Sequence, residues 1–243
     1  MGSNNIKTEG IVLNSIKYGD NSIIVNILTQ LLGRQAYMIK VNGKNRRSIL
    51  PLMQPLSIVD FEAVQNNKAT IHRLAEVHIG TPLSNLHFDP IKRSIALFIT
   101  ELLQKSVRND IVDDNFYLFA RNSVLALDEG MGGVHNFHLY FMWKLMRLLG
   151  FEPDVSCPAQ GLFDMVDGCF VNRLPIHKHI LSGTDVDLWL TLSQLTLENI
   201  ATIQLNRHQR QRMITLMEQF YSLHIPSFVG LNSASVLSSL AID

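Results

Sequence analysis

The segment "KTEGIVLNSIKYGDNSIIVNILTQLLGRQAYMIKV", Lys7 to Val41, decides the fold of the first part of the chain. Its apolar residues come in short runs broken by polar residues, as they do in half-buried strands. Glycine-containing turns interrupt these runs at Gly19–Asn21 and at Gly33. The segment therefore predicts three consecutive strands, over residues 8–18, 21–29 and 34–41.

Two further strands are predicted downstream, from "SIVDFEA" (57–63) and "ATIHRLAEV" (69–77), around a turn at "QNNK" (65–68). Five short strands within about seventy residues indicate a small closed barrel. The OB-fold is the commonest five-stranded arrangement, and an SH3-like barrel would give much the same pattern. We expect the barrel to form a domain over residues 1–80.

Beyond Pro82 the apolar residues take helical spacing. Asp89 is suited to cap a helix N-terminus and Pro90 to occupy its first position, and this helix should run to about Val107. Its buried face is predicted to contain Ile91, Ile95, Phe98, Ile99, Leu102 and Leu103. Further helices are predicted over 113–129, 136–149, 186–196 and 206–224. The chain is thus expected to be an α+β protein, with a barrel followed by an α-helical domain over 81–243 that carries an irregular insertion at about 151–180.

The net charge of zero hides an asymmetry between the two predicted domains. Residues 1–80 contain nine Lys and Arg against five Asp and Glu, whereas residues 81–243 contain twelve against sixteen. A basic first domain joined to a mildly acidic remainder is what we expect when only the first domain contacts a polyanion.

The candidate polyanion site is a basic loop between the third and fourth predicted strands, with Lys44, Arg46 and Arg47 beside Gly43. Cations at a barrel rim reach phosphates while they stay hydrated, although a solvated hairpin tip has the same composition. Cations of neighbouring strands would extend the loop into a continuous stripe: Lys7, Lys17, Arg34, Lys40 and Arg73. Few aromatic side chains accompany them, which favours contact with the nucleic-acid backbone over base recognition.

The sequence shows only weak matches to the residue patterns of metal sites and enzymes. Cys157 and Cys169 stand alone, because Gln160 and Asn172 follow where a paired zinc ligand would lie. A Cys-Cys-His-His set with His177 and His179 is arithmetically possible, but we favour a metal-free insertion without a cofactor. The nucleophile-elbow, P-loop, zinc-protease and dinucleotide motifs are all missing, so we expect no enzyme.

Two further features concern the cellular location of the protein and the cations of its last predicted helix. Two cysteines without a secretion signal suggest a reducing, cytoplasmic location, and no apolar run is long enough to predict a membrane span. The last helix begins with Arg207, Arg210 and Arg212, which we interpret as a solvated face rather than a binding surface.

In its order of parts the chain resembles the bacterial RecO family. The segment 7–41, the basic loop and "LPLMQPLSIVDF" (50–61) look like the N-terminal module of that family. "LLGFEPDVSC" (148–157), "FDMVDGCFV" (163–171) and "FYSLHIPSFVGLNSASVL" (220–237) resemble the landmarks of its C-terminal half. The likeness covers the chain from about Lys7 to Leu237.

The resemblance implies an N-terminal OB-fold and a helical domain with an irregular, zinc-ribbon-like insertion. Members of the family bind single- and double-stranded DNA, anneal complementary strands and load RecA onto strands covered by single-strand-binding protein, together with RecR and often RecF. DNA contact is carried over to Lys44, Arg46, Arg47 and Arg34, and more loosely to Lys40. Zinc is not carried over, because only two of the four cysteines found in many members are present.

In the family the acidic, hydrophobic tail of single-strand-binding protein docks on the helical domain. We expect its docking site between the helices at 91–107 and 134–149, with Arg93, Lys144 or Arg147 receiving the carboxylates. Two other functions remain open. One is a protein-interaction scaffold of the same complex with little DNA binding of its own, and the other is a thiol or metal enzyme that uses Cys157 or Cys169.

Overall fold

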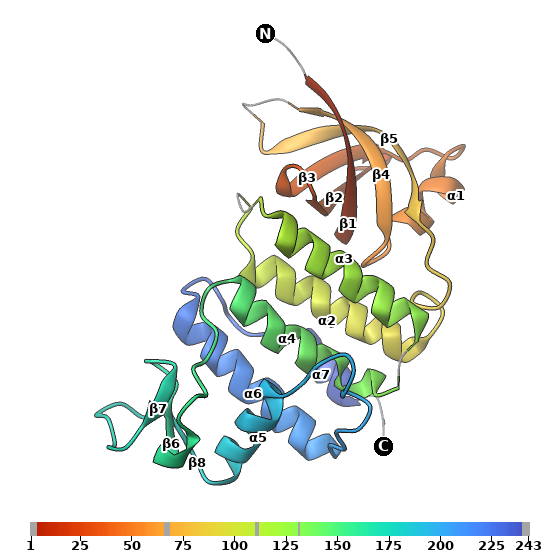
Figure 1. Ribbon diagram of the computed structural model, residues 1–243. Coiled ribbons are helices and arrows are strands. Elements are labelled where there is room, and N and C mark those ends of the chain that lie inside the picture. The colour runs from red at the N-terminus through yellow and green to blue at the C-terminus, as the bar shows by residue number, and fades with distance from the viewer. Residues whose placement is uncertain (1–3, 66–68, 110–111, 131, 240–243) are drawn as a thin grey trace. The chain divides into compact units, whose positions relative to one another are not determined.

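The computed structural model describes residues 4–65, 69–109, 112–130 and 132–239. The chain forms two compact units, residues 1–130 and 131–243. The first unit contains a β-barrel with helices packed on it, and the second contains helices and a small β-sheet (Figure 1). The helices at 90–106 and 114–129 thus belong to the same compact unit as the barrel.

The barrel contains all five predicted strands: β1 (Asn4–Tyr18), β2 (Ser22–Thr29), β3 (Gly33–Lys40), β4 (Ile58–Gln65) and β5 (Ile71–Thr81). It closes in the order β1-β2-β3-β5-β4, with β1 antiparallel to both β2 and β4. β3 and β5 close the remaining edge as a short parallel pair. This is the OB arrangement, so the OB-fold prediction is confirmed over the SH3-like alternative. Residues 66–68 of the predicted turn lie outside the described residues.

The first strand, β1, is 15 residues long, and it pairs with β4 along its first half and with β2 along its second half. A β-bulge between Val12 and Asn14 bends it, as closure of a small barrel requires. Gly10 lies opposite Thr29 on one side and Val59 on the other. A Cβ atom there would collide with the Ile27 side chain and would lie 3.2 Å from the Leu28 carbonyl oxygen. The close approach of β1 to β2 therefore requires glycine at this position.

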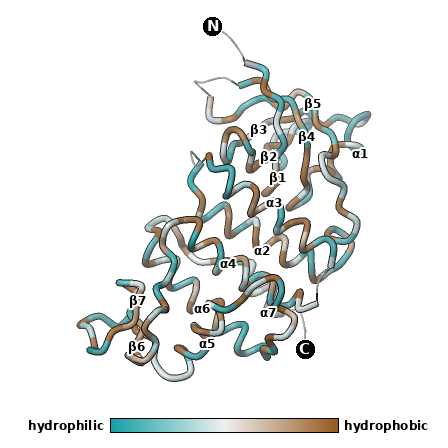
Figure 2. Tube along the Cα trace, viewed as in Figure 1, coloured by the Kyte–Doolittle hydropathy of each residue, from teal (hydrophilic) through white to brown (hydrophobic). Residues whose placement is uncertain are grey.

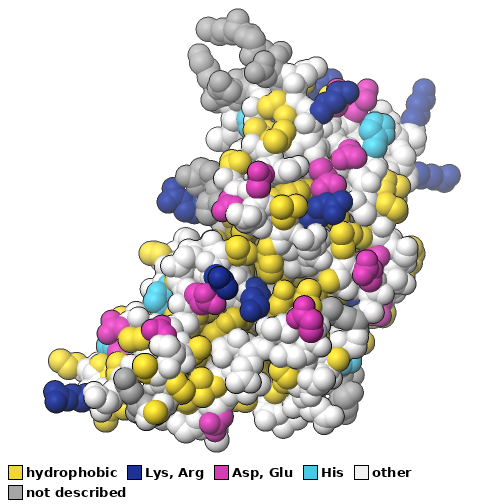
Figure 3. Space-filling view, in the orientation of Figure 1, with side chains coloured by type: hydrophobic (Ala, Val, Ile, Leu, Met, Phe, Trp, Pro, Cys, Tyr) yellow, Lys and Arg dark blue, Asp and Glu magenta, His cyan; other side chains and the backbone are white. Residues whose placement is uncertain are grey.

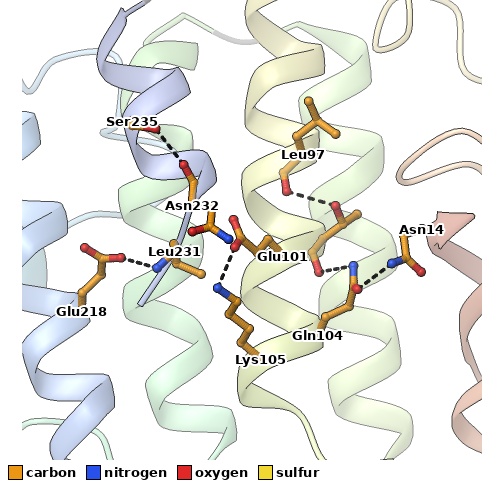
Figure 4. A network of polar contacts seen from close by, with 10 residues as sticks. Asn14, Leu97, Glu101, Gln104, Lys105, Glu218, Leu231, Asn232 and Ser235 are labelled. Carbon is orange, nitrogen blue, oxygen red and sulfur yellow. Dashed lines mark hydrogen bonds and ion pairs between the residues drawn. The ribbon is translucent and has the colours of Figure 1, made fainter. Parts of the chain in front are cut away.

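Two helices, α2 (Pro90–Ser106) and α3 (Asp114–Glu129), are held against β1 of the barrel by polar contacts. The Glu9 carboxylate accepts hydrogen bonds from the Tyr117 hydroxyl and the Arg121 guanidinium, each at 2.8 Å. The Asn14 amide donates to the Gln104 side chain at 2.9 Å (Figure 4). The predicted N-cap of α2 is also present, since the Asp89 side chain accepts from the backbone N–H groups of Ile91 and Lys92.

A buried carboxylate holds in place the segment that connects the barrel to α2. Asp128, near the end of α3, accepts hydrogen bonds from the backbone N–H groups of Ser84, Asn85 and Leu86 at 2.7–2.9 Å. Burial alone would raise the pKa of Asp128, but these hydrogen bonds and the nearby Lys92 ammonium together lower it. The carboxylate therefore stays charged and fixes the path of the chain between the barrel and α2.

The second unit is built around α4 (Phe137–Leu148), which is buried on almost every side. It packs with α5 (Thr184–Ser193) and α6 (Arg207–His224), while α7 (Ser233–Ser239) packs against α6. Figure 2 shows the hydrophobic residues along α4. The Trp143 and Trp189 rings meet edge to face at 5.0 Å, and the Tyr221 hydroxyl donates to the Met142 carbonyl oxygen at 2.9 Å. No helix in the described part of the chain is both long and apolar enough to span a bilayer.

The structure corrects three details of the predicted elements. The stretch expected to be irregular contains a three-stranded antiparallel sheet of β6 (Leu162–Asp164), β7 (Cys169–Val171) and β8 (Ile180–Ser182). The basic loop contains a one-turn helix, α1 (Arg46–Ile49), followed by a 3₁₀ turn at Leu50–Met53. The C-terminal α7 was not predicted at all. These elements are three to seven residues long and therefore too short to show a sequence period.

We predict that Gly10→Ala destabilises the barrel by about 1–3 kcal/mol, the usual effect of overpacking a core. Ile27 is fully buried and branched at Cβ, so its side chain cannot move aside without disturbing the core. Gly43→Ala is the matched control, because a Cβ atom on Gly43 meets nothing within 4 Å. Urea unfolding of both variants checks this prediction, and equal stability of the two would show that the β1–β2 contact tolerates a side chain.

Candidate nucleic-acid interface

A groove opens on the barrel where β3 and β5 separate. The two strands pair in parallel only over 36–38 and 71–73, and beyond this point α1 lies beside them. The resulting cavity has a volume of about 470 Å³ and is lined mainly by Met38, Lys40, Asn45, Ile49, Arg73 and Val77. We call it the β3–β5 groove. Lys40 and Arg73 place two cations on its wall, while Glu76 and His78 also line it.

The basic segment Lys44–Arg47 continues from this groove onto α1. Asparagine side chains shape it, since Asn45 Oδ1 accepts from the Asn42 N–H at 2.7 Å and Asn45 Nδ2 donates to the Lys40 carbonyl at 3.1 Å. These contacts turn the chain so that Lys44, Arg46 and Arg47 all stay exposed. Dark blue Lys and Arg side chains project at the edge of the barrel that carries α1 (Figure 3).

The cations at this place are available to a ligand. Lys40, Lys44, Arg46, Arg47 and Arg73 are exposed, and none of them forms an ion pair with a carboxylate of the described residues. Exposed cations without an ion-pair partner can contact phosphate groups directly, because no internal salt bridge has to be broken first. The structure thus brings together four of the five predicted DNA contacts, Lys40, Lys44, Arg46 and Arg47, and adds Arg73.

Arg34, the fifth predicted contact, is bound inside the first unit. Its guanidinium donates to the Gln104 carbonyl oxygen at 2.8 Å, near the end of α2, and burial lowers its pKa. A half-buried side chain that joins a strand to a helix is poorly placed to reach phosphates. Lys7 is also engaged, in an ion pair with Glu62 on the neighbouring strand. The predicted stripe of cations is therefore shorter than the sequence suggested.

Aromatic side chains contribute little to this surface. Tyr37 and Phe61 pack edge to face at 5.0 Å inside the barrel core, where burial raises the pKa of Tyr37. Tyr18, at the end of β1, is 57% exposed and is free to stack on a base. A surface with several cations and little stacking area suits contact with the nucleic-acid backbone rather than sequence recognition.

The contribution of Arg73 to the groove could not be read from the sequence. Lys40 and Arg73 are far apart in the chain, and the parallel pairing of β3 with β5 places them on the same wall. Strand periodicity shows which face of a strand is buried, but it does not show which strands are neighbours. Arg73 was therefore predicted only as one member of a stripe.

The predicted peptide-docking cations lie in different units. Arg93 is exposed on α2 of the first unit, whereas Lys144 and Arg147 belong to α4 of the second. Arg147 is exposed and lies 3.7 Å from the Glu152 carboxylate. Lys144 is half-buried, and its charge helps the hydrogen bonds from Thr196 and the backbone to lower the pKa of Glu198. A groove between their helices stays a prediction.

The insertion contains both cysteines of the chain, and neither belongs to a cluster of metal-binding side chains among the described residues. Cys157 is exposed and Cys169 is half-buried on β7, and burial and nearby carboxylates raise the pKa of Cys169. Among the described residues, no three His, Cys, Asp or Glu side chains gather as a metal site would require. The insertion is held instead by Asp164, whose buried carboxylate lies 3.2 Å from His177 Nε2.

The cations at the start of α6 are mostly occupied within the second unit. The Arg212 guanidinium binds the Asp185 carboxylate through two contacts, one of them at 2.8 Å from Nε. Arg210 donates to the Leu205 carbonyl oxygen. Arg207 is exposed at the first position of the helix. These contacts favour a structural face over a second polyanion site.

Comparison with known proteins agrees with this architecture. The family model for the N terminal part of recombination protein O matches residues 1–82, and the one for its C terminal part matches residues 87–232. The DNA repair protein RecO of Phocaeicola vulgatus is 33% identical over 236 residues, which cover 96% of this chain and 98% of the relative. Those of Bacteroides fragilis and Flavobacterium psychrophilum are each 32% identical, covering 96% and 97% of this chain and 98% of either relative. With its OB barrel, its helical second half and these relatives, the chain belongs to the RecO family and has a role in DNA repair and recombination.

Proposed function

We propose that this chain is a non-enzymatic mediator of DNA repair that binds DNA without sequence preference. The observation that carries the proposal is the group of exposed cations without internal partners at the β3–β5 groove and on α1. We call these five residues the groove cations: Lys40, Lys44, Arg46, Arg47 and Arg73. Such a group in a chain of a DNA-repair family is best explained by contact with phosphates.

The physical mechanism follows from charge. Each cation that contacts a phosphate releases condensed counterions from the DNA, so binding gains entropy without reading any base. Two strands held on one cationic surface repel each other less than they do in solution. The bases stay free to pair because few aromatic side chains occupy them. The barrel is therefore suited to promote annealing of complementary strands.

The remaining proposals concern partners. We propose that the chain works in the cytoplasm with RecR, and in a RecF-containing complex also with RecF, to load RecA onto strands covered by single-strand-binding protein. RecR would supply additional cationic surface, which a chain with a net charge of zero needs for tight DNA binding. The alternative is a scaffold of the same complex with little DNA binding of its own. The neutral net charge and the scarcity of stacking residues at the groove favour that alternative.

We predict that replacing Lys44, Arg46 and Arg47 together by alanine weakens binding of single-stranded DNA and lowers its salt dependence. The plot of log affinity against log salt concentration should lose about 2 units of slope, because three phosphate contacts contribute about 0.7 each. Fluorescence anisotropy with a labelled oligonucleotide across a salt series measures both quantities. A small drop in affinity with an unchanged slope does not agree with phosphate contact.

The matched control removes the same charge elsewhere. Arg93, Arg147 and Arg207 are exposed and lie on helices outside the barrel, so their triple alanine variant should keep most of the wild-type slope. If both triple variants lose equal slope, the DNA responds only to total charge and the groove is not the site. If wild type binds no DNA even at low salt, the scaffold alternative holds.

We also propose that Arg93, Lys144 and Arg147 receive the carboxylates of the acidic tail of single-strand-binding protein. The triple alanine variant should bind a tail peptide about tenfold more weakly, because three charge contacts near the surface together contribute roughly 1–2 kcal/mol. Isothermal titration calorimetry with the peptide measures the loss. The Lys44, Arg46 and Arg47 triple alanine variant is the control, and peptide affinity unchanged in the first variant rules this docking site out.

A further inference from the structure

A second surface with mixed chemistry lies on the insertion of the second unit. The connection between β7 and β8, residues 172–179 with the sequence "NRLPIHKH", is called the insertion loop. Its Leu174 side chain is 78% exposed and Ile176 is fully exposed. Arg173 and Lys178 flank these apolar residues and are exposed as well. From 168 to 184 the sequence contains no Asp or Glu. Figure 3 shows hydrophobic and cationic side chains together at the end of the insertion, beyond β7.

The base of the insertion loop is firmly held. Both flanking strands pair with β6, and the Met165 N–H donates to the His179 carbonyl oxygen at 3.0 Å. His177 lies against the buried Asp164 carboxylate, which also accepts from the backbone N–H groups of Val166 and Asp167. Pro175 restricts the backbone between the two exposed apolar residues. The loop therefore presents Leu174 and Ile176 to solvent on a fixed support.

Single exposed apolar residues are common on protein surfaces and need no explanation. Two large ones held apart by a proline and flanked by an arginine and a lysine are a different case. Leu, Ile and Pro are among the residues that proteins insert between the base steps of DNA. Arg and Lys side chains are common contacts of DNA phosphates. The insertion loop combines both chemistries within six residues, 173–178.

We propose that the insertion loop is a second DNA contact, at which Leu174 and Ile176 insert between bases and Arg173 and Lys178 bind the flanking phosphates. The inference rests on the proposed DNA binding of the chain, but it assigns a separate site with a different chemistry. The groove cations would hold the backbone, and the insertion loop would unstack bases. Unstacked bases are better exposed to a complementary strand than stacked ones are.

DNA fits this surface better than the alternatives. A membrane anchor needs a broad apolar face, and the insertion loop offers two side chains beside only two cations. An acidic peptide would be recognised most readily by a groove, whereas these side chains form a projecting tip. A projecting apolar tip between cations matches the gap between two bases and its adjoining phosphates. Because the family acts in DNA repair, DNA is the polyanion that we expect this surface to meet.

The test uses the full-length protein and a single-stranded oligonucleotide that contains 2-aminopurine, whose fluorescence rises when neighbouring bases unstack. Wild type should raise the fluorescence at saturation. The L174S/I176S variant should lose this rise and bind about tenfold more weakly, as expected when contacts to bases are removed. Its salt slope should stay unchanged, because no charge is removed. Both side chains are exposed, so the variant should keep the wild-type Tm.

Two further variants sharpen the test. R173A/K178A should lower the salt slope by about 1.4 units, the value for two phosphate contacts on a single strand. F88S/V229S is the matched control, because Phe88 and Val229 are 80% and 83% exposed and neither is next to an Arg or Lys in the sequence. This control should keep both the affinity and the fluorescence rise of wild type.

The outcomes separate the inference from the proposed function. If wild type binds the oligonucleotide and L174S/I176S gives the same affinity and fluorescence, the inference is overturned while the proposed function stands. If wild type binds no DNA, both are overturned. If L174S/I176S binds DNA normally but loses binding to phosphatidylserine vesicles or to an acidic peptide, the loop serves another partner and the inference is again overturned.

Discussion

The first unit depends on the double pairing of β1. This strand closes the barrel by binding β2 on one side and β4 on the other, and Gly10 permits the close approach on the β2 side. The same strand carries Glu9 and Asn14, which bind the helices α3 and α2. Closure of the barrel and attachment of the helices thus share one element. A shift of β1 would therefore disturb both the packing of the barrel core and the attachment of the two helices.

Barrel closure also produces the candidate site. Because β1 joins β4, the last contact has to form between β3 and β5, and this pair is parallel and only three residues long. Its early separation leaves room for α1 and opens the β3–β5 groove. The groove cations lie where the backbone is least regular and solvent can reach it. Arg34 shows the contrast, since its guanidinium is used to join β3 to α2. Two cations of the same strand, Arg34 and Lys40, therefore have different roles: Arg34 binds α2 and Lys40 lines the groove.

Much of the fold could be predicted from the sequence, because strands and long helices have a visible period. Caps such as Asp89 and stop signals such as Gly150 fixed the helix ends within a few residues. The one-turn helix α1 and the three-residue strands of the insertion have no period to detect. The candidate site was only partly predicted, and the reason is related. Lys44, Arg46 and Arg47 are adjacent in sequence, whereas Arg73 reaches the groove only through strand pairing, and the tie between Arg34 and Gln104 joins residues that are distant in the chain.

The central claim is that the groove cations hold the DNA backbone. The most direct measurement is photo-crosslinking of full-length protein to a single-stranded oligonucleotide that carries 4-thiothymidine, followed by mass spectrometry of the linked peptides. We expect crosslinks within residues 38–49 and 73–78, the segments that contain the residues lining the β3–β5 groove. Crosslinks that avoid both segments and fall on α6 or on the helices α2 and α3 would contradict it.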